Sequence, residues 1–184
     1  MSTVSSTPIQ RVVIIGAEST GKSTLAAGLA AHYNTVWVPE YLREFVETQQ
    51  RTPWAEEQLP IAITQCEREM KSEAKAHRYL FCDTSPLMTA VYSEFYFGQV
   101  EAELNALASR HIYAATIVTA PTTPWIADGL QRESDAVRQH IHARLVRKLV
   151  DADIAYLLVD GDTQQRITQV VAYLAQGETD KASQ

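Results

Sequence analysis

Short apolar runs alternate with stretches of helical periodicity along most of the chain. The runs with strand character are residues 12–15, 35–38, 79–82, 113–119 and 154–159. The first, VVII, is apolar at every position, which is typical of a strand buried on both faces of a parallel sheet. Because helical segments separate the five runs, we predict an α/β fold with a five-stranded parallel sheet and helices on both of its faces.

The segments between these runs carry apolar residues at helical spacing, and several have clear end signals. Residues 135–150 are predicted as an amphipathic helix because an apolar residue recurs at every fourth position. Thr52 and Pro53 predict a helix start, and Pro60 predicts a break or kink soon afterwards. Asp162 and Gln165 have the spacing of a capping box for a last helix.

The composition is that of one soluble globular domain. Of the 184 residues 46% are hydrophobic, and 16 Lys and Arg against 22 Asp and Glu leave a net charge of −6. This acidic balance argues against nucleic acid as a partner, because binding to a phosphate backbone needs clustered basic residues. No apolar run reaches the roughly 18 residues of a membrane span, and the first residues lack the features of a secretory signal. We therefore expect a cytoplasmic protein with a flexible tail over 1–9 and a single domain over 10–178.

Residues 16–24, GAESTGKST, carry the most specific motif in the chain. They match the pattern G-x-x-x-x-G-K-[ST] in full, between the first predicted strand and the first predicted helix. In such a loop the backbone N–H groups and the helix start form a cradle for phosphates. The lysine reaches the β- and γ-phosphates, and the serine hydroxyl binds Mg²⁺. The motif thus predicts binding of ATP and Mg²⁺ by Gly16, Glu18, Ser19, Thr20, Gly21, Lys22, Ser23 and Thr24.

The rest of the sequence favours one class of P-loop protein over others. Guanine-nucleotide switches need an N-K-x-D motif, and neither Asn34 nor Asn105 begins one. Motors and AAA-type ATPases usually need a longer chain and an arginine from a partner. A small-molecule kinase fits better, because residues 121–136 form an arginine-bearing loop suited to be a lid that excludes water. A regulatory ATP-binding protein without kinase activity is the alternative.

Two acidic residues follow predicted strands at the edge where open α/β sheets bind their ligands. Glu40 comes after the second strand and Asp83 comes after the third. We interpret Glu40 as the general base or as a ligand of the acceptor hydroxyl. Asp83 is interpreted as a ligand of Mg²⁺ or its water, or as the alternative base. Arg43 either holds substrate or pairs with Glu40.

Further candidate residues lie in the lid and among the aromatic side chains. Arg132 and Arg138 are candidate cations that close over the phosphates. Asp128 either orders the lid or contacts the substrate. The aromatic residues, among them Tyr41 and Tyr92, belong either to the core or to a pocket that holds a planar base.

Four segments, taken together, resemble a known family. They are GAESTGKSTL at the phosphate loop, EYLREF after the second strand, DTSPLMT after the third and WIADGLQR after the fourth. In this order they are similar to the ribosylnicotinamide kinase domain of NadR-type proteins, over about Arg11 to Gly177. Two positions depart from the family pattern. Ser85 stands where that pattern has a second acid, and Gln131 shifts Arg132 by one residue.

The resemblance implies a P-loop NTPase fold of the nucleoside- and nucleotide-kinase kind, with a specific reaction. That reaction is ATP-dependent phosphorylation of the 5′-hydroxyl of nicotinamide riboside, which gives nicotinamide mononucleotide. A nucleoside acceptor with a cationic pyridinium ring is compatible with an acidic protein whose aromatic residues lie near the acceptor site. Another nucleoside or nucleotide kinase is the alternative. The chain has no adenylyltransferase motif of the H-x-G-H type, so the expected activity is the kinase step alone.

Overall fold

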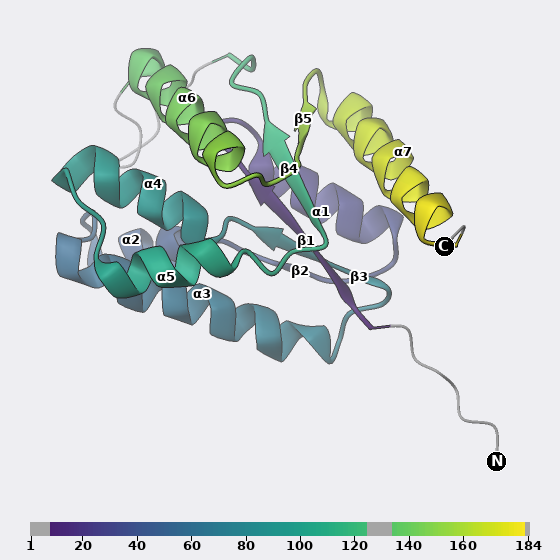
Figure 1. Cartoon of the computed structure of the whole chain (residues 1–184), viewed down its shortest axis with the longest axis horizontal. Helices are drawn as coiled ribbons and strands as arrows, with labels where there is room; N and C mark the ends of the chain where they lie inside the picture. The colour runs from purple at the N-terminus through teal and green to yellow at the C-terminus, as the bar shows by residue number, and fades with distance from the viewer. Residues whose placement is uncertain (1–7, 125–133, 183–184) are drawn as a thin grey trace.

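The computed structural model describes residues 8–124 and 134–182, and its centre is a five-stranded parallel sheet (Figure 1). The strands are β1 (Gln10–Ile15), β2 (Trp37–Val38), β3 (Tyr79–Asp83), β4 (Ala115–Thr119) and β5 (Leu157–Val159). Their order in the sheet is β2-β3-β1-β4-β5, and every neighbouring pair is parallel. The carboxyl ends of all five strands therefore lie along the same side of the sheet, where ligands bind in folds of this class.

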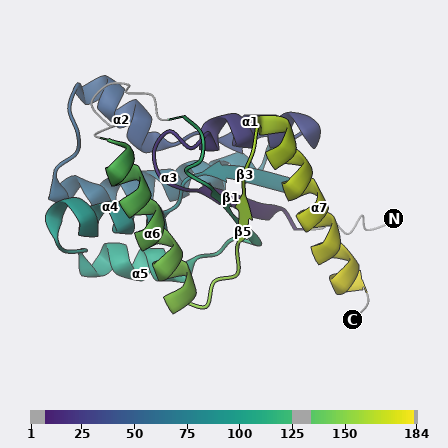
Figure 2. The same cartoon turned by 90° about the horizontal axis from the view of Figure 1, so that it is seen from above.

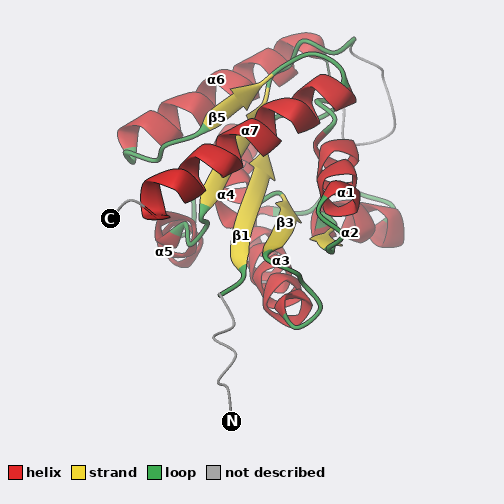
Figure 3. Cartoon of the chain, turned by 90° about the vertical axis from the view of Figure 1, so that its right-hand side faces the viewer, coloured by secondary structure: helices red, strands yellow, loops and turns green. Residues whose placement is uncertain are grey.

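Helices cover both faces of the sheet, which confirms the predicted α/β architecture (Figures 2 and 3). One face is covered by α1 (Lys22–His32) and α7 (Thr163–Ala182). The other face is covered by α3 (Gln58–Glu73), α4 (Pro86–Phe97), α5 (Ala102–Arg110) and α6 (Asp135–Asp151). The short helix α2 (Tyr41–Gln49) packs on α3.

The apolar sequence of β1 follows from its central position in the sheet. Val13 and Ile15 pack into the core beneath α4, α5 and α6, whereas Val12 and Ile14 pack into the core beneath α1 and α7. Each of these four side chains is at most 1% exposed. Because successive strand residues point to opposite faces, a strand between two helix layers needs an apolar residue at every position.

Two predicted helix features are confirmed at the level of individual hydrogen bonds. The helix expected over 135–150 is α6, and the Ser134 hydroxyl caps it by accepting the Val137 N–H at 3.2 Å. The capping box at the start of α7 is also present. Asp162 Oδ1 accepts the Gln165 N–H at 2.8 Å, and Gln165 Oε1 accepts the Asp162 N–H at 2.9 Å.

The prediction for the start of α3 is wrong, and so is the predicted length of the edge strands. The helix expected at Thr52 and Pro53 begins at Gln58, after a 3-10 turn over Ala55–Glu57. Pro60 therefore lies in the first turn of α3 and does not break it, because N–H groups in a first turn have no acceptor within the helix. β2 and β5 have only 2 and 3 residues, since each lies at an edge and pairs on one side.

Part of the predicted tail and most of the predicted lid, residues 1–7 and 125–133, lie outside the described residues. Within the described part of the chain, none of the helices combines the length and the apolar character that crossing a membrane requires.

Glu69 on α3 is a fully buried carboxyl group with polar neighbours. The Tyr113 hydroxyl donates to both of its oxygens at 3.1 Å, and Arg11 Nη1 lies 3.5 Å from Oε2. Arg11 also pairs with Glu73, with 2.6 Å between Nε and Oε1. Burial raises the pKa of Glu69 to about 7, although Tyr113 and Arg11 favour its charged form.

We expect the Glu69→Gln variant to gain stability relative to the wild type as the pH rises from about 5 to about 8. The raised pKa means that the wild-type protein keeps its proton on Glu69 when folded and loses it when unfolded, so folding becomes less favourable above the unfolded-state value. The wild type then loses up to about 3 kcal/mol over this interval, whereas glutamine does not titrate. Urea unfolding at both pH values measures the difference, and Glu73→Gln is the control beside the same arginine. A difference between wild type and Glu69→Gln that does not change with pH would contradict the assignment.

Candidate active site

The phosphate loop, residues 16–23, follows β1 and runs into the first turn of α1. The backbone at position 16 passes so close to the end of β4 that only glycine fits, because a Cβ there would lie 2.2 Å from Thr119 Oγ1. Gly21 stands directly before α1 with a φ of 81°, a conformation that glycine adopts without strain. The two glycines thus allow the tight path that leads backbone N–H groups and a helix start to one point.

One side chain of the loop itself and two from other segments hold the carbonyl groups of this loop. The Thr20 hydroxyl donates to the Ala17 carbonyl at 2.8 Å, and the Thr123 hydroxyl donates to the Ser19 carbonyl at 2.9 Å. The guanidinium of Arg166 on α7 donates to the Thr20 carbonyl. In a planar trans peptide the C=O and the following N–H point in opposite directions. Each carbonyl that is held from outside therefore turns the next N–H to the other side, as a phosphate cradle requires.

Ser23 and Asp83 bring two oxygen atoms together beside the loop. Ser23 Oγ donates to Asp83 Oδ2 at 2.5 Å, and Asp83, the last residue of β3, is 1% exposed. Its other oxygen, Oδ1, is buried without a hydrogen-bond partner among the described residues. Mg²⁺ in nucleotide sites takes one or two protein oxygens and completes its shell with phosphates and water. This pair of residues fits that requirement.

Glu40 lies directly before α2. The positive charge of Lys22 acts on both Glu40 and Asp83. Burial raises the pKa of Glu40; Lys22 and Arg43 lower it, and Asp83 raises it further. Burial also raises the pKa of Asp83, against the effects of Lys22, the Ser23 hydrogen bond and Arg43. A carboxyl group with a raised pKa accepts a proton more readily near neutral pH. The site therefore combines a phosphate-binding cation with two carboxyl groups suited to proton transfer or metal binding.

Gln65 on α3 connects the segments that carry these two carboxyl groups. Its Oε1 accepts the Tyr41 N–H at 2.9 Å, one residue after Glu40, and its Nε2 donates to the Asp83 carbonyl at 3.3 Å. The side chain is 2% exposed. Sequence analysis missed this residue. The available signal was an amide at position 65, four residues after Ile61, on the buried face of α3.

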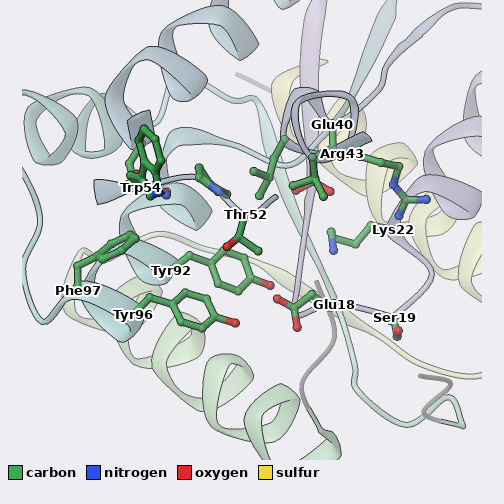
Figure 4. A pocket seen from close by; sticks show the side chains of 14 residues that line it. Glu18, Ser19, Lys22, Glu40, Arg43, Thr52, Trp54, Tyr92, Tyr96 and Phe97 are labelled. Atoms are coloured by element: carbon green, nitrogen blue, oxygen red, sulfur yellow. Dashed lines mark hydrogen bonds between the residues drawn. The ribbon is translucent and has the colours of Figure 1, made fainter. Parts of the chain in front are cut away.

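A cavity of about 350 Å³ opens between the phosphate loop, α2 and α4 (Figure 4). Charged residues line the end nearest the loop, namely Glu18, Lys22, Glu40 and Arg43. The cavity continues away from the loop past residues 52–54 to the aromatic side chains of α4. Its shape therefore offers one region for a polar, reacting group and a second region for a flat, apolar one.

Aromatic rings form one wall of this cavity. Tyr92 and Tyr96 are stacked, with ring centroids 6.1 Å apart and ring planes 14° from parallel, and Figure 4 shows both hydroxyls directed toward Glu18. Trp54 stands at the far end and is 56% exposed. The Arg51 guanidinium covers its ring at 3.7 Å from the centroid and is held by two 2.7 Å hydrogen bonds to Glu57.

The remaining predicted residues lie in different places. Tyr41 is not among the described residues that line the cavity; its ring lies under the Arg68 guanidinium at 4.4 Å. Thr24 is exposed in the first turn of α1. Arg138 is buried and donates to the carbonyls of Thr123 at 2.8 Å and Ser19 at 3.5 Å, so it reaches the outside of the phosphate loop.

The other lid candidates, Arg132 and Asp128, lie outside the described residues and stay predictions from the sequence.

Arg166 is a second residue that sequence analysis missed. Its position, four residues before Val170 and eight before Leu174, belongs to the buried face of α7. An arginine in an otherwise apolar stripe was the signal, because such a residue is almost never buried without a polar partner.

The sheet order, the loop after β1 and the Ser23–Asp83 contact define a P-loop nucleotide-binding fold. The chain belongs to the AAA domain family, whose model matches residues 11–166. Sequence analysis set AAA-type ATPases aside on chain length and on the need for a partner's arginine, whereas the family model shows that this chain carries an AAA domain.

Curated relatives are named "Trifunctional NAD biosynthesis/regulator protein NadR" and confirm the resemblance found from the four segments. The protein from Escherichia coli (strain K12) is 27% identical over 161 residues, which are 83% of this chain and 38% of the relative. The protein from Salmonella typhimurium (strain LT2) is 28% identical over 160 residues, 82% of this chain and 38% of the relative. The chain thus spans well under half the length of these relatives.

Solved structures share the fold. The NadR protein in complex with NR has a TM-score of 0.80 and 23% identity, and the match covers 90% of this chain and 52% of that one. Thymidylate kinase from Candida albicans has a TM-score of 0.68 and 15% identity, covering 93% of both chains. Deoxyadenosine kinase from M. mycoides has a TM-score of 0.64 and 11% identity, covering 90% of this chain and 99% of that one.

Proposed function

We propose that this protein is an ATP-dependent kinase that transfers the γ-phosphoryl group to the 5′-hydroxyl of a nucleoside. The observation that carries the proposal is that Lys22 and Glu40 line one end of the cavity, and that Lys22 also acts electrostatically on Asp83, which accepts the Ser23 hydroxyl. Phosphoryl transfer needs little covalent chemistry from a protein, and it depends on positioning and on charge stabilisation. A phosphate cradle that opens into a cavity with a carboxyl group meets both needs.

Each residue has a distinct part in this proposal. Lys22 and the loop N–H groups bind the triphosphate, while Ser23 and Asp83 hold Mg²⁺, which neutralises phosphate charge when bound. Glu40 orients the acceptor hydroxyl and takes its proton, with Asp83 as the alternative base. Arg43, which also lines the cavity, holds the acceptor or pairs with Glu40.

Nicotinamide riboside is the acceptor that we propose. The NadR relatives and the NadR structure in complex with NR support this choice. The cavity supports it independently, because the stacked rings of Tyr92 and Tyr96 lie beside the carboxylate of Glu18. Aromatic faces and carboxylates both stabilise a planar cation such as a pyridinium ring.

An assay with a panel of acceptors tests this function. The protein is incubated with ATP, Mg²⁺ and one of nicotinamide riboside, adenosine, cytidine, thymidine or thymidine monophosphate, and the products are separated and identified by mass. We expect the 5′-monophosphate of nicotinamide riboside to form fastest. The same preparation of the Lys22→Ala variant controls for contaminating kinases.

The outcomes separate the alternatives. Faster conversion of another nucleoside or of the nucleotide would keep the kinase and overturn the choice of acceptor. ATP binding without any phosphorylated product, with every acceptor, would favour a regulatory nucleotide-binding protein.

A further inference from the structure

Arg166 on α7 is a buried cation without an ion-pair partner among the described residues. Three arginines of the described chain are buried: Arg11, Arg138 and Arg166. Arg11 pairs with two carboxylates of α3 and Arg138 pairs with Asp135 at 2.5 Å. Arg166, only 2% exposed, lies against backbone carbonyls instead. Burying a charge is costly unless an opposite charge or several hydrogen bonds compensate it, so this placement needs an explanation.

The contacts of Arg166 all lead to the phosphate loop or its surroundings. One guanidinium nitrogen, Nη1, donates to the Thr20 carbonyl, and Nη2 donates to the Ala120 carbonyl at 3.4 Å, just after β4. The third nitrogen, Nε, is buried without a hydrogen-bond partner in the described part of the chain. A Cβ built on Gly21 would lie 3.3 Å from Nη1, so the cation packs directly against the loop backbone.

The negative charge that the protein itself offers compensates the Arg166 cation only weakly. Asp160 is the carboxylate that acts on Arg166, but its Oδ1 accepts the Thr122 hydroxyl and the Gly161 N–H instead. Burial consequently lowers the pKa of Arg166 from its usual value, although Asp160 opposes this shift. A polyphosphate in the loop would supply the missing negative charge.

We propose that Arg166 is a positioning residue that sets the affinity of the loop for nucleotide phosphates. It holds the Thr20 carbonyl outward, which turns the Gly21 N–H inward, and its buried charge is balanced when a di- or triphosphate binds. The inference rests on nucleotide binding by the loop and does not need phosphoryl transfer to any acceptor.

Substitution of Arg166 is expected to separate stability from affinity. In the Arg166→Met variant the uncompensated charge is gone, so the nucleotide-free protein should melt at or above the wild-type temperature. The dissociation constant for ADP, measured by isothermal titration calorimetry, should rise by about ten- to a hundredfold, the range for losing a hydrogen bond to a charged group. Arg166→Lys keeps the charge but lacks the fork that spans two carbonyls, and it should fall between wild type and Arg166→Met.

Arg11→Met is the matched control, since Arg11 is also buried but pairs with carboxylates of α3, on the other face of the sheet and away from the loop. It should melt lower than the wild type and bind ADP unchanged. An Arg166→Met protein that binds ADP within twofold of the wild type would overturn the proposal. If that variant does not fold, Arg166→Lys decides, and ADP binding within twofold of the wild type would overturn it equally. A wild-type protein that binds ADP but phosphorylates no acceptor would contradict the kinase function and leave this test intact.

Discussion

Replacing Lys22 by alanine is expected to lower kcat for phosphoryl transfer by about a thousandfold or more. The ammonium group is the cation that the structure places between the phosphate loop and the two carboxyl groups, and a point charge at the transferring phosphoryl group stabilises its transition state. The alanine variant also takes away the cation that lowers the pKa values of Glu40 and Asp83 more than Arg43 does, so the pKa values of both carboxyl groups should rise further. Steady-state assays with saturating ATP and acceptor measure the effect on kcat.

The fold should survive this change, because Lys22 lies in the first turn of α1 and only its side chain bonds to the Ala17 carbonyl, at 3.1 Å. The melting temperature checks this point. Lys71→Ala, a substitution of a lysine that is 78% exposed on α3, controls for a general effect of removing a positive charge. A Lys22→Ala protein that keeps more than a tenth of the wild-type kcat would contradict the assigned role.

The second large effect is expected from a comparison of Asp83→Asn with Glu40→Gln, which separates a metal ligand from a base. Asp83→Asn removes the charge next to Ser23 and should abolish activity at ordinary Mg²⁺ concentrations or shift the Mg²⁺ dependence to much higher concentrations. Glu40→Gln should keep the wild-type Mg²⁺ dependence and lose about a hundred- to ten-thousandfold in kcat, the usual contribution of general base catalysis. Activity measured against Mg²⁺ concentration for both variants gives the answer.

The pH profile supplies an independent check on the base. Because burial raises the pKa of Glu40, the wild-type kcat should fall as the pH decreases through that raised value, at a higher pH than an ordinary glutamate would give. This acidic limb should be absent from the residual activity of Glu40→Gln. If Asp83→Asn removes the acidic limb and Glu40→Gln keeps it, the two roles are exchanged.

The phosphate loop and the strand that precedes it could be predicted from the sequence because their signals are local. An apolar run, two glycines and a lysine within a short segment specify the conformation together. α6 was predicted for the same reason, since its apolar period lies within one segment. Asp83 followed from its position at the end of a strand, and the pairing of β3 with β1 brings it to Ser23.

The residues that sequence analysis missed depend on contacts between distant segments. Gln65 acts through Tyr41 and Asp83, which lie 24 and 18 residues away along the chain. Arg166 acts on Thr20 across 146 residues. Each was visible as a polar residue on a buried helix face, but the pattern does not say which partner meets it. Pro60 was misread for a local reason. A proline breaks or kinks a helix in its interior but is accepted in a first turn, and the sequence pattern placed the helix start too early.

The dependence of the loop on Arg166 has a consequence for how the protein is made. The motif itself is complete once residue 24 has been synthesised, but α7, which holds the Thr20 carbonyl, begins only at Thr163. A chain emerging from the ribosome therefore carries the whole phosphate-binding signature long before it has the support that shapes it. On our proposal for Arg166, tight nucleotide binding by this protein therefore requires that its last helix has been made and has docked on the loop.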